Sequence, residues 1–388
     1  MIKILDKSKC SGCHACLNIC PKRCISMKTD CEGFWYPSID MDKCIDCNLC
    51  EKVCSIYNDL NKIDNKMTAY ACKNLNEQIR NTSSSGGVFT LLCEYIIKNG
   101  GVVFGAAFNE SFEVEHMHAE TLEECFKFRG SKYVQSKIGN TYKEAKKYLD
   151  EGKLVLFSGT PCQISGFDLF LMKKYKNLLM IDIACHGVPS PLVYKKYFRS
   201  LEEINNSRIS SLSFRDKTTG WKNYSFKVEF KNGKVIKEIG YNNIYMKGFL
   251  SDIYLRPSCY DCKSKKPTTS ADITLADYWG IQNIHSDFDD DKGVSLVLVN
   301  TKLGQDIMKG LSSNMDIIES NLDYALKCNP SIEIASKYNT RRKEFFEELN
   351  RNNIENNIYK YTKISFVKRL KRKILNILYR LKINDKLN

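Results

Sequence analysis

Eight cysteines near the start of the chain fall into two runs of identical spacing, and their pattern is chemically specific. Each run places three cysteines at two-residue gaps and a fourth after a gap of three. The runs are Cys10, Cys13, Cys16 and Cys20, followed by Cys44, Cys47, Cys50 and Cys54. Three thiolates at this spacing fit one tight loop around a 4Fe-4S cube, and the fourth points toward the other cluster. We therefore predict two 4Fe-4S clusters that exchange fourth ligands, with Cys54 on the first and Cys20 on the second.

Zinc sites and a disulfide framework are the alternative explanations of these runs. Zinc modules usually offer two separated pairs of ligands and need no exchanged fourth ligand. Disulfides need an oxidising compartment, and residues 1–9 contain no hydrophobic signal core. Residues 8–56 resemble the bacterial two-cluster ferredoxin, although Ser55 stands where a second proline is usual. Cluster potentials span roughly −700 to +450 mV, so the runs predict electron transfer without giving its direction.

Length and charge limit the remaining function classes. The chain has 388 residues, 43% of them hydrophobic, which suffices for two domains with buried cores. Its 18 cysteines without a secretion signal indicate a reducing cytoplasm. More than half of the net charge of +14 lies in residues 361–388, so we expect no nucleic-acid-binding body. No apolar run approaches the roughly eighteen residues that a transmembrane helix needs.

Alternating strands and helices after the cysteine runs predict an α/β fold, α+β overall, with a mainly parallel mixed sheet. Predicted strands cover 68–72, 101–105, 112–118, 154–157, 178–183 and 294–299, with a hairpin over 224–239. Predicted helices cover 88–98, 141–151, 164–174, 192–204 and 303–311. We expect a ferredoxin-type domain over 1–57, a linker over 58–66, an α/β domain over 67–330 and a helical basic tail over 331–388.

Four more cysteines form a second candidate metal set. Cys162 follows one buried strand, Cys185 follows the next, and Cys259 and Cys262 form a pair at metal-clip spacing. If the two strands lie side by side and parallel, both single thiols sit at the ligand crevice of the sheet. A third 4Fe-4S cluster, a zinc ion, a redox dithiol and unconnected buried thiols all stay open on spacing alone. We interpret the other cysteines as packing or surface thiols: Cys24, Cys31, Cys72, Cys93, Cys125 and Cys328.

Five blocks between residues 67 and 330 resemble, in order and spacing, the coenzyme F420 hydrogenase/dehydrogenase beta-subunit family. They are 83–89, 130–136, 159–163, 185–187 and 256–262, the last continuing to 280. The resemblance implies an FAD-bearing domain that passes electrons between a deazaflavin coenzyme and iron–sulfur carriers. It also implies a third 4Fe-4S cluster on Cys162, Cys185, Cys259 and Cys262. Ala276, before Asp277, departs from the family, which often has glycine there.

A flavin would need anion-binding and stacking groups, and several residues are candidates. The segment 83–87 ahead of a helix suits a pyrophosphate, and an ordinary serine N-cap is the alternative. The candidate cofactor contacts are Ser84, Ser85, Gly86, Gly87, Lys132, Tyr133, Gly159, Thr160 and Asp277. Arg215, Lys217 and Trp221 would meet an anionic substrate tail or form a solvated turn. We name no catalytic acid or base, because hydride transfer to a flavin is the cofactor's chemistry.

The end of the chain is basic and amphipathic. Apolar residues recur at helical spacing over 364–381, with Lys and Arg between them. Such a helix suits an anionic membrane surface, which would place the protein peripherally there, or an acidic partner. A helix packed on its own body is the alternative.

Two functions agree with these patterns. The first is a flavin-dependent oxidoreductase in which a reduced deazaflavin, or a substitute donor, gives hydride to FAD and electrons leave through the clusters, or the reverse. The second is an electron-transfer subunit without a substrate of its own, serving a separate reductase or metabolite-modifying partner. Both need a redox partner protein or another electron acceptor.

Overall fold

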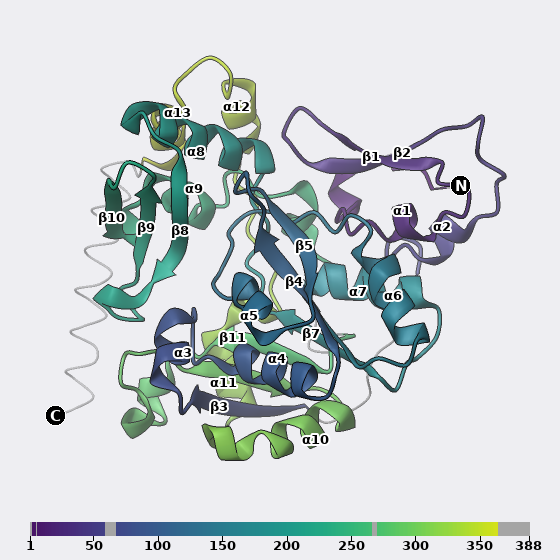
Figure 1. Ribbon diagram of the computed structural model, residues 1–388. Helices are drawn as coiled ribbons and strands as arrows, with labels where there is room; N and C mark the ends of the chain where they lie inside the picture. The colour runs from purple at the N-terminus through teal and green to yellow at the C-terminus, as the bar shows by residue number, and fades with distance from the viewer. Residues whose placement is uncertain (1, 5, 59–66, 266–269, 364–388) are drawn as a thin grey trace.

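The computed structural model describes residues 2–4, 6–58, 67–265 and 270–363. Figure 1 shows three parts: a small N-terminal module at the upper right, a large sheet with helices below, and a second sheet with helices at the upper left. The N-terminal module lies beside the helices that cover one face of the large sheet (Figure 1).

The N-terminal module repeats one loop-and-helix unit around a β-hairpin. Its elements are α1 (Ala15–Ile19), β1 (Ile25–Thr29), β2 (Trp35–Ile39) and α2 (Leu49–Lys52), and β1 pairs with β2 antiparallel. His14 and Asn48 occupy equivalent places in the two cysteine runs, and both adopt a left-handed backbone, with φ of 63° and 58°. Asparagine and histidine are enriched in this region. The two runs therefore fold into matching loops, as their spacing predicts.

Within the described residues, the large sheet has eight strands in the order β13-β3-β12-β11-β7-β6-β4-β5. The strands are β3 (Thr68–Asn74), β4 (Val102–Phe108), β5 (Val114–Ala119), β6 (Val155–Gly159), β7 (Leu178–Ile183), β11 (Ile273–Asp277), β12 (Ser295–Val299) and β13 (Met315–Ser320). The four central strands β11, β7, β6 and β4 are parallel. The outer pairings are antiparallel. The carboxyl ends of four strands therefore meet at one edge.

Helices cover both faces of this sheet. They are α3 (Glu77–Thr82), α4 (Val88–Lys98), α5 (Leu122–Cys125), α6 (Thr141–Asp150), α7 (Pro161–Leu171), α10 (Lys302–Gly310) and α11 (Leu322–Cys328). Along β6, Leu156 packs in the core that contains α4 and α10, whereas Val155 and Phe157 pack in the core that contains α6 and α7. A strand buried on both faces needs apolar side chains at every position, which explains the uninterrupted hydrophobic run.

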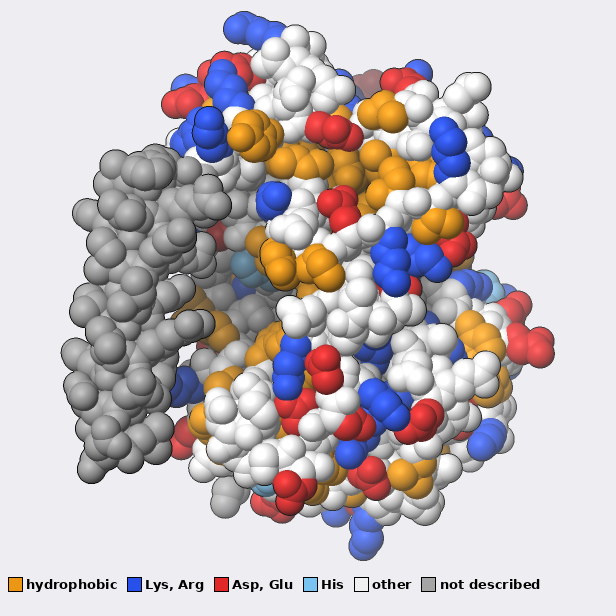
Figure 2. Space-filling model, turned by 90° about the vertical axis from the view of Figure 1, so that its left-hand side faces the viewer, with side chains coloured by type: hydrophobic (Ala, Val, Ile, Leu, Met, Phe, Trp, Pro, Cys, Tyr) orange, Lys and Arg blue, Asp and Glu red, His pale blue; other side chains and the backbone are white. Residues whose placement is uncertain are grey.

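The second sheet carries the remaining large core. It contains β8 (Ile209–Asp216), β9 (Ser225–Phe230) and β10 (Val235–Ile239), all antiparallel. The helices packed with it are α8 (Pro191–Asn205), α9 (Ile244–Leu250), α12 (Arg342–Glu347) and α13 (Ile354–Thr362). Phe345 and Ile358 are fully buried there, so α12 and α13 are part of this core. Figure 2 shows hydrophobic side chains gathered across the upper half of the face that carries this sheet.

The structure confirms the predicted α/β class with a large mixed sheet. α4 begins and ends at the predicted residues, and β6 and β7 are adjacent and parallel, as expected. Strands β8 and β13 were not predicted, so the antiparallel share of the structure is larger than expected. The predicted basic amphipathic helix over 364–381 lies outside the described residues. In the described part of the chain, no helix combines the length and apolar character needed to cross a membrane.

Candidate functional site

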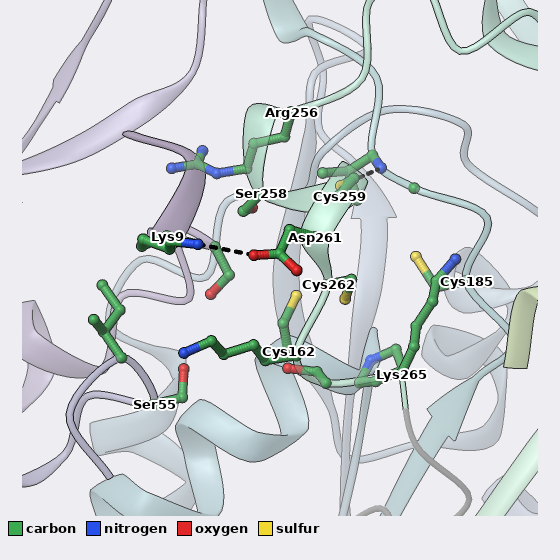
Figure 3. A pocket seen from close by; sticks show the side chains of 17 residues that line it. Lys9, Ser55, Cys162, Cys185, Arg256, Ser258, Cys259, Asp261, Cys262 and Lys265 are labelled. Carbon is green, nitrogen blue, oxygen red and sulfur yellow. Dashed lines mark hydrogen bonds and ion pairs between the residues drawn. The ribbon is translucent and has the colours of Figure 1, made fainter. Parts of the chain in front are cut away.

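The second cysteine set converges on one pocket at the carboxyl edge of the large sheet. Cys162 lies in the first turn of α7, directly after β6, and Cys185 lies two residues beyond β7. Cys259 and Cys262 come from a short 3₁₀ turn at Pro257–Asp261. All four line the same pocket, and Figure 3 shows them around a shared space.

Four cationic side chains and a single carboxylate lie among the residues that line this pocket: Lys9, Arg256, Lys263, Lys265 and Asp261. Lys265 is 6% exposed, and its ammonium donates to the carbonyls of His186 and Ile334, both at 3.0 Å. Lys9 of the N-terminal module pairs with Asp261 at 2.8 Å across the pocket mouth, as Figure 3 shows. The backbone N–H of Val188 points at Cys259 Sγ at 3.4 Å. Cations and N–H groups around four thiols suit a negatively charged thiolate cluster.

Burial makes these thiols poor acids on their own. It raises the pKa of Cys162 and of Cys259 to about 12. Burial also raises the pKa of Cys185 well above its usual value. The thiolate form therefore needs a bound cation, as metal ligands do.

The spacing of the thiols bears on which metal group would fit. Among the residues that the structure describes, no three Cys, His, Asp or Glu side chains come close enough to hold one metal ion. A single zinc ion needs every sulfur about 2.3 Å from one point. A 4Fe-4S cube binds each thiolate to a different iron, so its ligands stand farther apart. Four thiols at one pocket supply the number of ligands that a 4Fe-4S cluster needs.

The structure brings the last cysteine of each N-terminal run beside cysteines of the other run. Cys54, from the second run, lies close enough to Cys10, Cys13 and Cys16 to interact with them electrostatically. The other four candidate ligands line a separate pocket: Cys20, Cys44, Cys47 and Cys50. Cys10, Cys16, Cys20 and Cys54 are buried, whereas Cys47 is exposed.

Cys24 is a buried packing thiol of the N-terminal module, as expected, and it also borders the second run. It lines the pocket of the second run, and its Sγ lies 3.3 Å from Cys20 Sγ. The sequence signal is its position four residues after Cys20, immediately before β1. The structure therefore places five thiols at this pocket.

The N-terminal module packs directly on the second cysteine set. The backbone of Gly166, one turn after Cys162 in α7, faces Cys13, and a β-carbon at Gly166 would stand 2.7 Å from Cys13 Sγ. On the other side, Arg342 makes a bidentate ion pair with Glu32 at the tip of the β1–β2 hairpin. The module is thus docked at both ends, with the first run facing α7.

Several candidate flavin contacts come together beside this edge. Ser84 accepts hydrogen bonds from the Ser131 backbone N–H at 2.8 Å and from its hydroxyl at 2.9 Å. Arg215 forms an ion pair with Asp277 at 2.8 Å and lies 3.4 Å from the Tyr133 hydroxyl. Ser84, Tyr133 and Asp277 therefore share one neighbourhood, organised by the buried Arg215.

The two candidate lysines are held by backbone carbonyls. Lys132 donates to three carbonyls of its own loop, those of Phe128, Arg129 and Gly130. Lys217 donates to the carbonyl of Ser85 at 2.9 Å and to those of Arg80 and Lys292. Burial lowers the pKa of each lysine to about 7. Both ammonium groups tie loops together at this edge.

The remaining candidates have structural explanations or lie elsewhere. A β-carbon at Gly86 would stand 2.3 Å from the carbonyl of Cys72 on β3, so this glycine allows the loop to approach the sheet. Gly87 has φ of +83° at the start of α4, a conformation that favours glycine. Thr160 Oγ1 lies 3.2 Å from Cys162 Sγ, which places Gly159 and Thr160 beside the second cysteine set.

Trp221 acts as a packing residue rather than as an exposed contact. It is fully buried, its indole N–H donates to Asp277 at 2.8 Å, and it stacks on Trp279 with ring centres 4.9 Å apart. The same carboxylate holds Arg215, so Asp277 fixes both a cation and a ring. Asp277 thereby positions the groups around it.

Three guanidinium N–H groups, one on Arg215 and two on Arg129, have no partner among the described residues. They are Nε of Arg215 and Nε and Nη2 of Arg129, all shielded from solvent. Arg129 also donates through Nη1 to Thr82 at 2.9 Å. Buried guanidinium N–H groups without an acceptor are rare and costly, so an anionic ligand would satisfy them. Arg129 and Ser131 were not among the predicted contacts, although Ser131 lies within the block 130–136 and Arg129 directly precedes it.

Comparisons with known proteins agree with this organisation. A family model described as the 4Fe-4S dicluster domain matches residues 9–56. Models of the coenzyme F420 hydrogenase/dehydrogenase beta subunit match residues 69–142 with its N-terminal part and 152–324 with its C-terminal part. No curated protein matches the chain.

One solved structure similar to this chain is a subunit of the F420-reducing [NiFe] hydrogenase complex from Methanosarcina barkeri. The two chains share 18% identity, with a TM-score of 0.45. The match covers 74% of this chain and 93% of the other.

Proposed function

The chain belongs to the coenzyme F420 hydrogenase/dehydrogenase beta-subunit family, and we propose that it uses FAD to exchange hydride with a deazaflavin coenzyme or a substitute donor. The dicluster domain on the same chain gives it an iron–sulfur electron-transfer role in an oxidoreductase. The proposal adds the flavin, a third 4Fe-4S cluster and a path between them. When bound, FAD converts a two-electron hydride transfer into single-electron steps.

The proposed anion-binding residues are Arg215, whose Nη2 lies 3.5 Å from the Ser84 carbonyl, and Arg129, which bonds Thr82 two residues earlier. Arg129 and Arg215 keep buried N–H groups without partners there, and these would bind the pyrophosphate of the flavin. The hydroxyl of Tyr133 and the Trp221–Trp279 stack lie around the same arginine. Figure 2 shows that the face carrying the second sheet is hollowed near its middle, between its hydrophobic upper half and its charged lower half.

The observation that carries the proposal is a continuous line of contacts from this neighbourhood to the second cysteine set. The ring of Tyr133 stacks on Phe249 with centres 4.8 Å apart. Phe249 meets the ring of His186 edge-on at 5.0 Å, and His186 follows Cys185 in the chain. A donor bound near Tyr133 would therefore be close to the third cluster and, through Cys162 and Cys13, to the first run.

The exposed second run is the proposed exit to a partner. Cys47 is exposed, as is Ile45, which lines the same pocket. An electron-transfer protein must bring a cluster close to its partner's acceptor. The first run and the second cysteine set are more deeply enclosed in the protein than the second run. We assign the second run to contact with a redox partner protein.

The decisive assay is donor oxidation by the anaerobically reconstituted chain. Reduced deazaflavin, NADH and NADPH would each be mixed with the protein, and bleaching of the flavin and cluster absorbance would be followed. The proposal expects one of these hydride donors to reduce the flavin and then the clusters. A chain that holds clusters and flavin but oxidises none of the three donors would instead be an electron-transfer subunit without a substrate of its own.

A further inference from the structure

Four arginines are buried in the described chain, and one of them differs in its electrostatic partners. Arg80 pairs with Asp290, Arg215 with Asp277 and Arg342 with Glu32. Arg256 is the most buried of the four, at 0% exposed, yet it has no carboxylate partner among the described residues. A buried cation without an opposing charge is strongly unfavourable, so a negative charge must be supplied in another way.

The contacts of Arg256 lead to the first cysteine run. Its Nε donates to the carbonyl of Cys10 at 2.8 Å, and Nη2 donates to the carbonyl of Trp35 at 2.9 Å. Nη1 donates to the side chain of Gln135 at 3.0 Å. Nη2 also lies 3.8 Å from Cys10 Sγ, within hydrogen-bonding range of a sulfur. Every oxygen acceptor is neutral, and the one ionisable acceptor is a predicted cluster ligand.

The surroundings hold the guanidinium in this place. Its centre lies 4.4 Å from the ring of Tyr36 and 5.4 Å from that of Phe34, two rings of the N-terminal module. A β-carbon at Gly12 would stand 2.8 Å from Nη1, so the absence of a side chain at Gly12 leaves room for the cation. The same arginine lines the pocket of the second cysteine set, just ahead of Cys259, as Figure 3 shows.

We propose that Arg256 is the countercharge of the cluster held by Cys10, Cys13, Cys16 and Cys54, and that it raises the reduction potential of that cluster. Reduction adds one electron and therefore one negative charge to the cluster. A fixed cation and an N–H to a ligand sulfur stabilise the reduced form more than the oxidised form.

This inference rests on the iron–sulfur assignment of the first run and does not require the flavin. The test is an EPR-monitored redox titration of the reconstituted full chain, comparing wild type with Arg256→Met and Arg256→Lys. A parallel titration of Cys47→Ser identifies the signal of the second run, so the other ferredoxin signal can be followed. Iron content, measured separately, reports whether the cluster assignment itself holds.

We expect Arg256→Met to lower the ratio of reduced to oxidised first-run cluster about tenfold at a fixed potential. For a one-electron couple this corresponds to a reduction potential that is about 59 mV lower. Arg256→Lys keeps the charge but loses the fork of donors, so its shift should be smaller and of the same sign. If Arg256→Met does not assemble the cluster, Arg256→Lys decides the question.

The matched control removes another buried guanidinium from the same interface. The double variant Arg342→Met with Glu32→Gln deletes a complete ion pair without leaving a buried charge, and it touches no cysteine. It should leave the potential of the first-run cluster unchanged. An unshifted potential in both Arg256 variants, with iron content intact, would overturn the proposal. An equal shift of the potential in the control would also overturn it, because the cause would then be weaker packing of the N-terminal module on the rest of the chain.

Discussion

The backbone of Gly166 packs against the side chain of Cys13, and this contact joins the N-terminal module to the α/β domain. A β-carbon on Gly166 would stand 2.7 Å from Cys13 Sγ and 2.8 Å from its Cβ. Gly166 lies four residues after Cys162 on α7. The same helix therefore carries a candidate ligand in its first turn and the contact with the N-terminal module one turn later. The close fit explains why this position carries no side chain.

The first prediction concerns this contact. Gly166→Ala should push α1 away from α7, lower the free energy of unfolding by about 1–3 kcal/mol through overpacking, and slow electron transfer between the two cysteine sets. Iron content should stay unchanged, because no ligand is altered. Chemical denaturation and stopped-flow reduction measure the two effects. Gly310→Ala is the control, since nothing lies within 4 Å of a β-carbon there; equal effects in both variants would contradict the docking role.

The second prediction tests the second cysteine set. Cys185→Ser should remove about four of about twelve irons from the reconstituted chain, while the ferredoxin signals persist. Iron analysis and EPR provide the measurement. Cys31→Ser, at an exposed cysteine of the same chain, should retain all of the iron. Full iron content in the Cys185 variant would mean that this thiol is not a ligand.

The third prediction concerns the unpartnered guanidinium groups beside Ser84. Arg129→Met should weaken FAD binding about tenfold or more, because charge-assisted hydrogen bonds contribute about 1.5–3 kcal/mol. Fluorescence titration of the flavin-free protein with FAD gives the dissociation constant. Arg199→Met removes an exposed arginine from α8 and should leave the affinity unchanged. Unaltered affinity in the Arg129 variant would place the pyrophosphate elsewhere.

The fourth prediction is a pH effect at His116. Burial lowers the pKa of His116 to about 4, and Lys132 lies near enough to add to this. Its Nδ1 is 2.5 Å from the Ser136 hydroxyl, and its Nε2 is 3.0 Å from the Ser158 carbonyl, which together suit the neutral ring. The unfolded chain binds a proton near pH 6.5. Stability should therefore fall as pH decreases from 6.5 toward 4, by about 2 kcal/mol between pH 7 and pH 5 from this residue alone.

The check is urea unfolding of wild type and of His116→Gln at pH 7 and pH 5. Glutamine cannot titrate in this range, so the variant should lose about 2 kcal/mol less than wild type over the same interval. The other ionisable groups are common to both proteins and cancel in the comparison. Identical pH dependence would show that His116 takes up a proton without penalty.

Local spacing predicted the parts of the site that short segments of the chain determine. The matching loops of the two cysteine runs follow from their spacing. The meeting of Cys162 with Cys185 follows from two successive buried strands that pair in parallel. Both inferences need only neighbouring elements.

Contacts between segments far apart in the chain could not be predicted from the sequence. Arg256 reaches Cys10 across 246 residues, and Arg342 reaches Glu32 across 310. Neither pairing leaves a pattern in the residues around it. The close approach of Gly86 to Cys72 on β3 is a further contact that the segment 83–87 does not reveal by itself.

The most direct test of the account is the cofactor content of the anaerobically reconstituted full chain. Three 4Fe-4S clusters and one flavin predict about twelve irons and one FAD per chain. About eight irons and no flavin would contradict the central claim. It would leave the dicluster module as the redox-active part and the pocket of Cys162, Cys185, Cys259 and Cys262 without a cluster.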